Sequence, residues 1–292
     1  MLAAITINID PILVQLGPIA IRWYGLMYVV GIVLGVRAGL PFVVAHGITE
    51  DQVWNVLGPC IVVGLLGGRL YYVVQQPLGP FLAQPWRILA TWEGGMAFFG
   101  AIFGVVLTLA VMSWREKFSF WWVFDGATIL AAVGQFFGRI GNVVNGDILG
   151  PPTTAWYGFV YANPNSFAEF HNVPFLPAAI FEMVADAIII GILFFMRSRV
   201  RSSGLIASAY LLCYSISQFI LFFVRDTEPT VGLNLKQAQL TSIVVFVVAC
   251  GVTAYRLRAA RTSVELTPLP AISAAGSQQG NGPSFPSGLD QR

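Results

Sequence analysis

Apolar residues occur in seven long runs, separated by short polar or mixed segments. A helix of about 20 apolar residues crosses about 30 Å of hydrocarbon, and each run is long enough for one crossing. The fourth run is the weakest of them, because Asp125 and Gln135 interrupt it. The predicted spans are 19–40, 53–76, 95–114, 121–141, 176–196, 205–225 and 238–257. The pattern therefore predicts an all-α integral membrane protein with about seven transmembrane helices.

The basic residues predict how these spans are oriented. Lys and Arg gather in the cytoplasmic loops of membrane proteins. With the N-terminus outside, the inner loops and tail hold Arg37, Arg115, Lys117, Arg197, Arg199, Arg201, Arg256, Arg258 and Arg261. The outer loops then hold Arg87, Arg225 and Lys236. We therefore expect an outer N-terminus and a cytoplasmic C-terminus.

Two segments lie outside the predicted spans. Residues 142–175 form a long outer loop, which is long enough to build a small extracytoplasmic unit. Residues 261–292 are rich in Pro, Ser, Gly, Ala and Gln, and we expect a disordered cytoplasmic tail there. The transmembrane domain, with its outer loop, then covers residues 1–260.

The composition agrees with a membrane protein and excludes several other classes. The chain is 56% hydrophobic and 10% charged, whereas a soluble domain carries about 25% charged residues. The net charge is only +2, and no basic stripe with interleaved aromatics occurs, so nucleic acid is not an expected partner. The three cysteines and two histidines stand far apart, so we expect neither a disulfide framework nor a metal site.

Several charged residues remain after the loops and the tail are set aside. They are Arg22, Arg69, Asp125, Arg139, Asp147, Glu182 and Asp186. Most of these, and Arg225, fall near the outer ends of their spans, at one predicted depth. Charged groups at the edge of hydrocarbon are costly to desolvate, so their convergence indicates a site for an anionic head group. Arginine suits a phosphate because it offers two parallel hydrogen bonds.

A purely structural interpretation of the same charges stays open. Arg69 and Arg139 could pair with Glu182 and Asp147 only to hold the helices together. Arg22 could simply extend its guanidinium to the membrane surface.

Other features predict packing rather than chemistry. Asp125 is expected near the cytoplasmic end of its span, where it suits a helix cap, and Asp186, which could point into the bundle, stays undecided. The turn 92–96 could present backbone N–H groups to an anion, with a tight turn as the equal alternative. Small residues four positions apart predict close helix packing. They are Gly31, Gly35 and Gly39, Gly100 and Gly104, and Gly134 and Gly138.

The segment 138–150 carries the most specific pattern in the chain. It reads Gly-Arg-Ile-Gly-Asn-Val-Val-Asn-Gly-Asp-Ile-Leu-Gly. The other matching positions are 22–27, 67–72, 92–98, Pro177, Glu182, Tyr214 and Arg225. In their order and spacing, these segments resemble the bacterial phosphatidylglycerol–prolipoprotein diacylglyceryl transferase family over roughly residues 10–260. The resemblance implies a multi-pass enzyme of the bacterial plasma (inner) membrane.

The resemblance also implies a reaction and its partners. A diacylglyceryl group moves from phosphatidylglycerol to the lipobox cysteine thiol of a prolipoprotein signal peptide, and a thioether forms as glycerol phosphate leaves. Membrane lipids surround the enzyme, and no cofactor is expected. By match, Arg139 is the main phosphate ligand. The full set of expected substrate-binding residues is Arg139, Arg69, Asn142, Asn145, Arg225, Tyr24 and Gly95.

The chain departs from the family pattern mainly on its acid–base side. Phe99 stands where the family has a histidine, and segment 176–182 has lost most polar members of its motif. Gln218 and Phe222 replace an arginine and a glutamate of the sixth span. Val143 replaces the aromatic residue of the signature, and Asp147 replaces its longer glutamate.

These departures leave carboxylates as candidates for the base that generates the thiolate. Glu182 is the first candidate, Asp147 the second and Asp186 a weaker third. The alternative function is a non-catalytic phospholipid- or lipoprotein-binding relative that has lost its base. A transporter is disfavoured, because its charges would lie at the midplane rather than toward one side.

Overall fold

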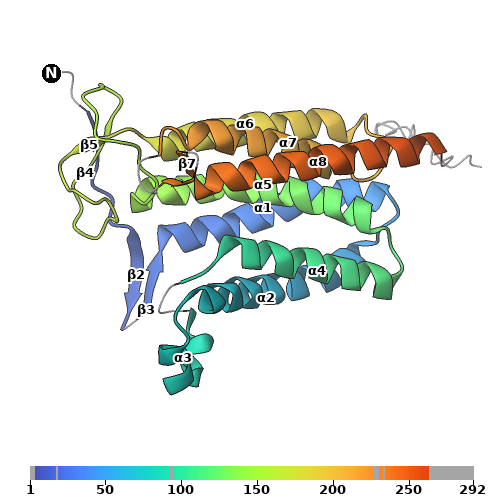
Figure 1. The fold of residues 1–292 in the computed structure, drawn as a ribbon, viewed down its shortest axis with the longest axis horizontal. Coiled ribbons are helices and arrows are strands. Elements are labelled where there is room, and N and C mark those ends of the chain that lie inside the picture. The colour runs from blue at the N-terminus through green and yellow to red at the C-terminus, as the bar shows by residue number, and fades with distance from the viewer. Residues whose placement is uncertain (1–3, 18, 92–94, 226–229, 233, 263–292) are drawn as a thin grey trace, which may run out of the picture.

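The computed structural model describes residues 4–17, 19–91, 95–225, 230–232 and 234–262. The helices of this part of the chain run side by side (Figure 1). They are α1 (Trp23–Ala45), α2 (Glu50–Gln75), α4 (Phe98–Glu116), α5 (Phe120–Asn145), α6 (Ala178–Arg197), α7 (Leu205–Leu221) and α8 (Gln237–Thr262). Within the described residues, six of them are long and apolar enough to cross a membrane, and α7 is a shorter apolar helix. The predicted fold class is confirmed, whereas the orientation of the termini stays a prediction.

The fourth predicted span forms one continuous helix despite its polar residues. Asp125 accepts backbone hydrogen bonds from Gly204 and Ala207, each at 2.7 Å. Gln135 accepts a hydrogen bond of 2.5 Å from the Tyr210 hydroxyl. Because these buried groups have partners on α7, they do not interrupt α5.

The glycine spacings mark the closest helix contacts, as predicted. A Cβ on Gly35 would lie 2.8 Å from the carbonyl oxygen of Leu130, and one on Gly39 would lie 2.9 Å from that of Gly126. The backbones of α1 and α5 can therefore approach each other only because these residues lack side chains. Gly67 and Gly104 play the same part between α2 and α4.

The first span begins later than the sequence pattern predicted. Residues 19–22 form strand β3 (Ile19–Arg22), which pairs antiparallel with β2 (Ile12–Leu16) before α1 starts at Trp23. Strand pairing satisfies the backbone of this apolar stretch outside the helix, and hydrophobicity alone does not distinguish the two states.

The loop between α5 and α6 folds against the N-terminal residues. Strand β4 (Phe159–Tyr161) pairs in parallel with β1 (Ile5–Ile7) and antiparallel with β5 (Pro174–Phe175). Leu149, Tyr161, Ala168 and Phe175 form a small apolar core beneath this sheet. We call residues 146–177, together with β1, the head. It lies at one end of the helices (Figure 1).

A shorter excursion joins α2 to α4. It contains α3 (Gly79–Ala83) and a 3-10 helix, η1 (Pro85–Ile88), and projects beside the β2–β3 hairpin (Figure 1). A second small hairpin, β6 (Thr230–Gly232) with β7 (Leu235–Lys236), precedes α8.

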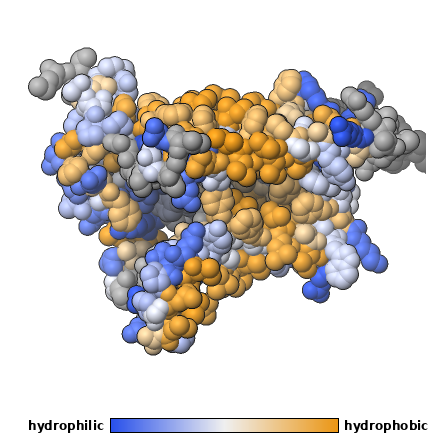
Figure 2. All heavy atoms as spheres, in the orientation of Figure 1, coloured by the Kyte–Doolittle hydropathy of each residue, from blue (hydrophilic) through white to orange (hydrophobic). Residues whose placement is uncertain are grey.

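The surface has the polarity of a membrane protein. Apolar side chains cover the middle of the helices, and hydrophilic side chains gather at both ends (Figure 2). Val74 and Trp114 are 75% and 81% exposed. Such large apolar groups are stable on this surface because lipid replaces water around them.

Candidate active site

A buried ion-pair cluster joins α5, α6 and the segment after α7 at the head end of the bundle. Arg139, near the end of α5, places Nη2 2.6 Å from Glu182 Oε2 and Nε 3.8 Å from Asp186 Oδ2. Arg225, after α7, places Nη1 3.5 Å from Glu182 Oε1. Glu182 and Asp186 are four residues apart, so both face α5 from the same side of α6. We call these four residues the arginine–carboxylate cluster.

The cluster is buried but not saturated with hydrogen bonds. The exposed fractions are 1% for Glu182 and 2% for Asp186. Among the described groups, no well-aligned hydrogen-bond partner exists for Arg139 Nε, either Glu182 carboxylate oxygen or Asp186 Oδ2. These buried groups therefore face one another as ion pairs whose geometry falls short of well-aligned hydrogen bonds.

A chain of side-chain hydrogen bonds extends from the cluster toward the head. Arg139 Nη1 donates to Asn142 Oδ1 at 3.3 Å, and Asn142 Nδ2 donates to Asp147 Oδ1 at 3.0 Å. Burial raises the pKa of the Asp147 carboxyl, and the hydrogen bond from Asn142 opposes that rise. Asn145 is 2% exposed, and its Oδ1 has no hydrogen-bond partner among the described groups.

The head is attached to the C-terminal end of α5, next to this chain of hydrogen bonds. The Tyr161 hydroxyl donates to the Val143 carbonyl at 2.9 Å, and burial raises the pKa of that hydroxyl. The Phe167 amide donates to the Asn145 carbonyl at 2.8 Å. Gly146 ends α5 with a φ of 74°, a conformation that glycine adopts without strain. The loop therefore covers the end of α5 rather than extending away from it.

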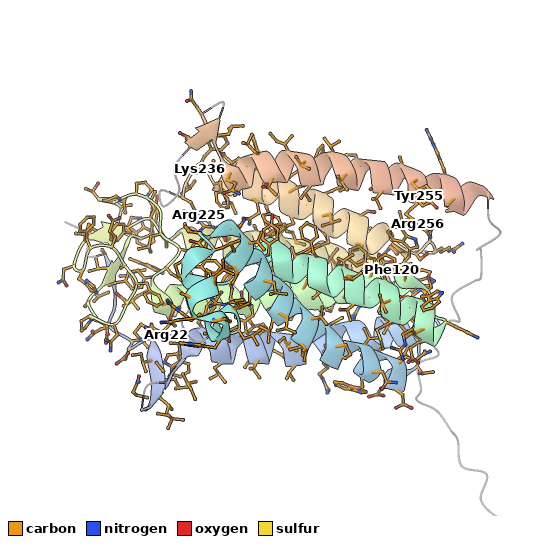
Figure 3. All side chains as sticks on the ribbon, turned by 60° about the horizontal axis from the view of Figure 1, so that its bottom comes forward. Arg22, Phe120, Arg225, Lys236, Tyr255 and Arg256 are labelled. Carbon is orange, nitrogen blue, oxygen red and sulfur yellow. The ribbon has the colours of Figure 1, made fainter. Side chains whose placement is uncertain are left out.

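The other charges predicted at the outer end lie there as well. Arg22, Arg225 and Lys236 appear at the head end, whereas Phe120, Tyr255 and Arg256 appear at the opposite end (Figure 3). Arg22 stands 4.2 Å from the ring centroid of Phe167 and donates to the Asn165 carbonyl at 3.4 Å. Arg22 therefore contacts the head rather than simply extending to the membrane surface.

Lys236 fastens the end of α7 beside the cluster. Its ammonium donates to the Phe222 carbonyl at 2.9 Å and to the Arg225 carbonyl. The guanidinium of Arg225 lies 4.5 Å from the Phe222 ring centroid. Arg225 therefore approaches Glu182 from the segment just after α7, which Lys236 holds in place.

Arg69 is buried, with 2% exposure, but its guanidinium serves another segment. It donates to the carbonyls of Ile88 at 3.0 Å, Gly95 at 2.9 Å and Arg87 at 2.6 Å. The predicted pairing of Arg139 with Glu182 exists, whereas these Arg69 bonds go to backbone carbonyls. Arg69 thus fixes the path of the chain between α2 and α4.

Gly95 is part of the same arrangement. It has a φ of 79°, and a Cβ there would overlap the ring of Tyr72. The tight-turn alternative for this glycine therefore has structural support. The preceding residues of the predicted anion turn, 92–94, lie outside the described part of the chain.

Tyr24 lies against the α5 segment that carries the cluster. A Cβ on Gly141 would lie 2.8 Å from Tyr24 Cα, and the Tyr24 hydroxyl donates to the Tyr28 hydroxyl at 3.0 Å. This contact places the tyrosine beside the helical turn that bears Arg139 and Asn142.

Two features near the cluster had only weak signals in the sequence. Asp186 contacts Arg139, and only its position inside an apolar span marked it. Tyr210 and Tyr214 stack with ring centroids 5.6 Å apart and lie near Arg139 and Asp186. In the sequence, the polar residue Gln135 inside an apolar span was the feature that could have pointed to this aromatic pair.

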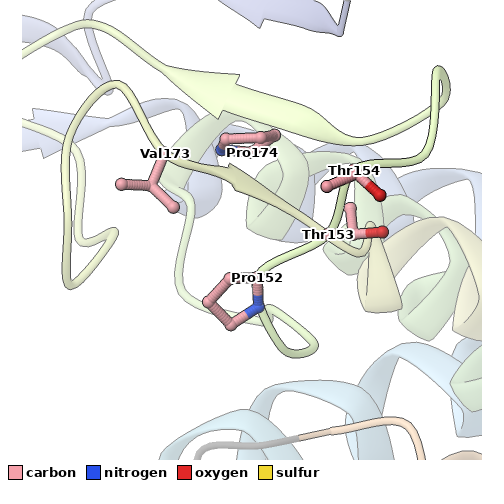
Figure 4. A pocket seen from close by; sticks show the side chains of 5 residues that line it. All are labelled: Pro152, Thr153, Thr154, Val173 and Pro174. Carbon is pink, nitrogen blue, oxygen red and sulfur yellow. The ribbon is translucent and has the colours of Figure 1, made fainter.

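Two other kinds of site can be assessed in the described residues. No group of three or more His, Cys, Asp or Glu side chains in that part of the chain could hold a metal ion. An open groove on the head is lined by Pro152, Thr153, Thr154, Val173 and Pro174 (Figure 4). Its lining has no charged side chain, so it does not match the phosphate chemistry of the cluster.

Comparison with known proteins identifies a family. The family model described as prolipoprotein diacylglyceryl transferase matches residues 11–255. A phosphatidylglycerol–prolipoprotein diacylglyceryl transferase of Paraburkholderia xenovorans is 30% identical, covering 92% of this chain and 98% of the relative. One of the same name from Solidesulfovibrio magneticus is 34% identical, covering 82% of this chain and 91% of the relative.

Proposed function

Because this chain belongs to the prolipoprotein diacylglyceryl transferase family, we propose that it transfers a diacylglyceryl group from phosphatidylglycerol to a prolipoprotein. The acceptor is the lipobox cysteine thiol at the end of the signal peptide. The observation that carries the proposal is the arginine–carboxylate cluster, which is buried, unsaturated and next to the head. The enzyme works in the bacterial inner membrane, with the head outside and the C-terminus in the cytoplasm.

The reaction makes a thioether at a glycerol carbon. The cysteine sulfur attacks the carbon that carries the phosphate ester, the carbon–oxygen bond breaks, and glycerol phosphate leaves with the bonding electrons. A cationic pocket lowers the barrier by stabilising the negative charge that collects on the departing phosphate. A base must remove the thiol proton, because the thiolate is the nucleophile.

Arg139 is the main phosphate ligand in this proposal, and Arg225 supports it from the opposite side of Glu182. Asn142 and Asn145 orient the head group, since Asn142 already contacts Arg139 and Asn145 has an unsatisfied oxygen. Tyr24 forms the neighbouring wall on α1. Arg69 and Gly95 act indirectly, by fixing the segment that leads into α4.

Glu182 is the proposed base, and Asp147 is the second candidate. Glu182 lies between both arginines, and its carboxylate is released for proton transfer when phosphate takes its place on Arg139. Asp147 is linked to Arg139 through Asn142. The Glu182→Gln variant should lose transfer, whereas full turnover in that variant would move the base role to Asp147.

The test is a transfer assay in phosphatidylglycerol vesicles with a lipobox peptide. Thioether-linked lipid on the peptide supports the proposal if the product requires Arg139. Phosphatidylglycerol binding without product would instead support the binding-only relative, for which Phe99 in place of the family histidine is the supporting observation. A lipobox peptide with serine in place of cysteine is the matched negative control.

A further inference from the structure

Each of the three nitrogens of the Arg139 guanidinium has a different neighbour. Nη2 faces Glu182 at 2.6 Å, Nη1 faces Asn142 at 3.3 Å, and Nε faces Asp186 at 3.8 Å. Asn142 and Glu182 contact the end of the guanidinium, whereas Asp186 approaches the edge nearest the side-chain stem. The two carboxylates therefore contact different nitrogens, Nη2 and Nε.

A charge count shows that these contacts cannot all persist when a lipid binds. The cluster holds two cations, Arg139 and Arg225, and two carboxylates, Glu182 and Asp186. A phosphodiester adds another negative charge beside carboxylates that already balance the arginines. To reach Arg139 Nη2, the phosphate must displace the carboxylate that occupies that edge at 2.6 Å.

Asp186 is suited to remain in contact with Arg139 during this exchange. It lies four residues after Glu182 on α6, about one helical turn away along the axis. Its side chain is shorter than that of Glu182 and only 2% exposed, so it is packed inside the bundle. Its Oδ2 lies 3.8 Å from Nε, whereas the phosphate is expected at Nη2, so the two contacts use different nitrogens.

We infer that Asp186 is a positioning residue that keeps the Arg139 guanidinium in place while Glu182 yields its contact to the lipid phosphate. The inference rests on the proposed function of the same cluster. Without the Asp186 carboxylate, only the hydrogen bond to Asn142 holds the Arg139 guanidinium once phosphate has displaced Glu182. Phosphatidylglycerol then binds less productively even though both arginines are intact.

The test compares Asp186→Asn and Asp186→Glu with the unaltered protein. We expect Asp186→Asn to lower kcat/KM for phosphatidylglycerol by about tenfold or more, the scale of one ion-pair contact near 4 Å. The KM for the lipobox peptide should stay unchanged, and Asp186→Glu should recover part of the loss. Asp51→Asn, an exposed acid at the start of α2, is the control for removing a negative charge.

A double-variant cycle separates positioning from a structural role. If Asp186 acts through Arg139, its replacement should have little further effect on phosphatidylglycerol binding in an Arg139→Lys background. Additive losses would overturn the inference, as would an Asp186→Asn protein with unaltered kcat/KM. Binding is measured with spin-labelled phosphatidylglycerol, so this comparison does not depend on turnover.

The same experiments separate the two proposals. If the unaltered protein forms product but Asp186→Asn behaves identically, only the positioning role is rejected. If the unaltered protein neither binds phosphatidylglycerol nor forms product, the proposed function fails, and the positioning role fails with it.

Discussion

The two ends of the helical bundle each bury a charged cluster, and the two clusters differ in how they are satisfied. Asp125 is fully buried, and each of its oxygens accepts a backbone N–H from the start of α7. Arg256 on α8 donates to the Ser203 carbonyl at 2.7 Å and to its hydroxyl at 2.5 Å. At the head end, by contrast, Glu182, Asp186 and Arg139 Nε lack well-aligned partners among the described groups.

The difference separates structural charges from charges that are available to a ligand. The Asp125 cluster caps a neighbouring helix, which satisfies the N–H groups that a helix start leaves unpaired. Among the described groups, the carboxylates of the arginine–carboxylate cluster pair with arginines, and both Glu182 oxygens and Asp186 Oδ2 lack well-aligned hydrogen bonds. Burial and charge are therefore poor guides to function by themselves. Whether the hydrogen bonds of a buried charged side chain are satisfied is more informative.

The largest expected effect comes from replacing the guanidinium of Arg139 at the head end. Arg139→Lys keeps the positive charge but loses the planar pair of donors. We expect transfer to fall about 10²–10³-fold, the range seen when one stabilising donor is removed from a reaction centre. Arg256→Lys is the matched variant at the other end, and its activity per folded molecule should be unchanged. Equal losses in both variants would erase the distinction between the ends.

The next effect should appear in stability rather than activity. Asp125→Asn replaces one carboxylate oxygen with an NH2 group, so one oxygen remains to accept from two backbone N–H donors. The new NH2 group faces a backbone N–H, from which it cannot accept a hydrogen bond. We expect a loss of about 2–3 kcal/mol in the free energy of unfolding. Chemical denaturation in detergent measures this value, and transfer per folded molecule provides the control. A variant of full stability with reduced transfer would assign Asp125 to the reaction.

A smaller effect should follow acidification of the head end. The pKa of Asp147 is raised by burial, so Asp147 takes up its proton at a higher pH than an ordinary aspartate with a pKa of about 3.9. Protonation weakens its hold on Asn142, so the KM for phosphatidylglycerol should rise about three- to tenfold as the pH falls through that pKa. Titrating KM between pH 4 and 8 measures the change.

Asp147→Asn is the control for this titration, because its KM should lack the acid-dependent rise. A rise of equal size in that variant would show that a group other than Asp147 titrates.

The smallest effect is expected at Arg22, which contacts the head but not the cluster. Arg22→Gln removes the cation above Phe167, worth about 0.5–1 kcal/mol at an exposed site. Thermal unfolding should shift slightly, and transfer should stay within about twofold of the unaltered protein. A tenfold loss of transfer would bring Arg22 into the substrate-binding set.

Parts of the site could be predicted from the sequence because they depend on local order. Arg139, Asn142 and Asn145 lie on the last two turns of α5, and Asp147 follows its C-cap, so these residues share a neighbourhood however that helix packs. Arg69 could not be placed this way. Its depth in the second span suggested the same head-group level, but its guanidinium faces the chain leading to α4. Depth in a membrane does not specify the direction of a side chain around its helix axis.

The sequence by itself determined the number and approximate limits of the apolar helices, the close-packed glycine faces and the polar segment after α5. These follow from composition and spacing along the chain, because a helix must be long and apolar enough to cross hydrocarbon. Only the tertiary structure decided that Glu182 and Asp186 share Arg139, that Asp125 caps α7, and that the N-terminal strand completes the head. These pairings depend on the rotation and packing of whole helices, which residues distant in the chain determine together.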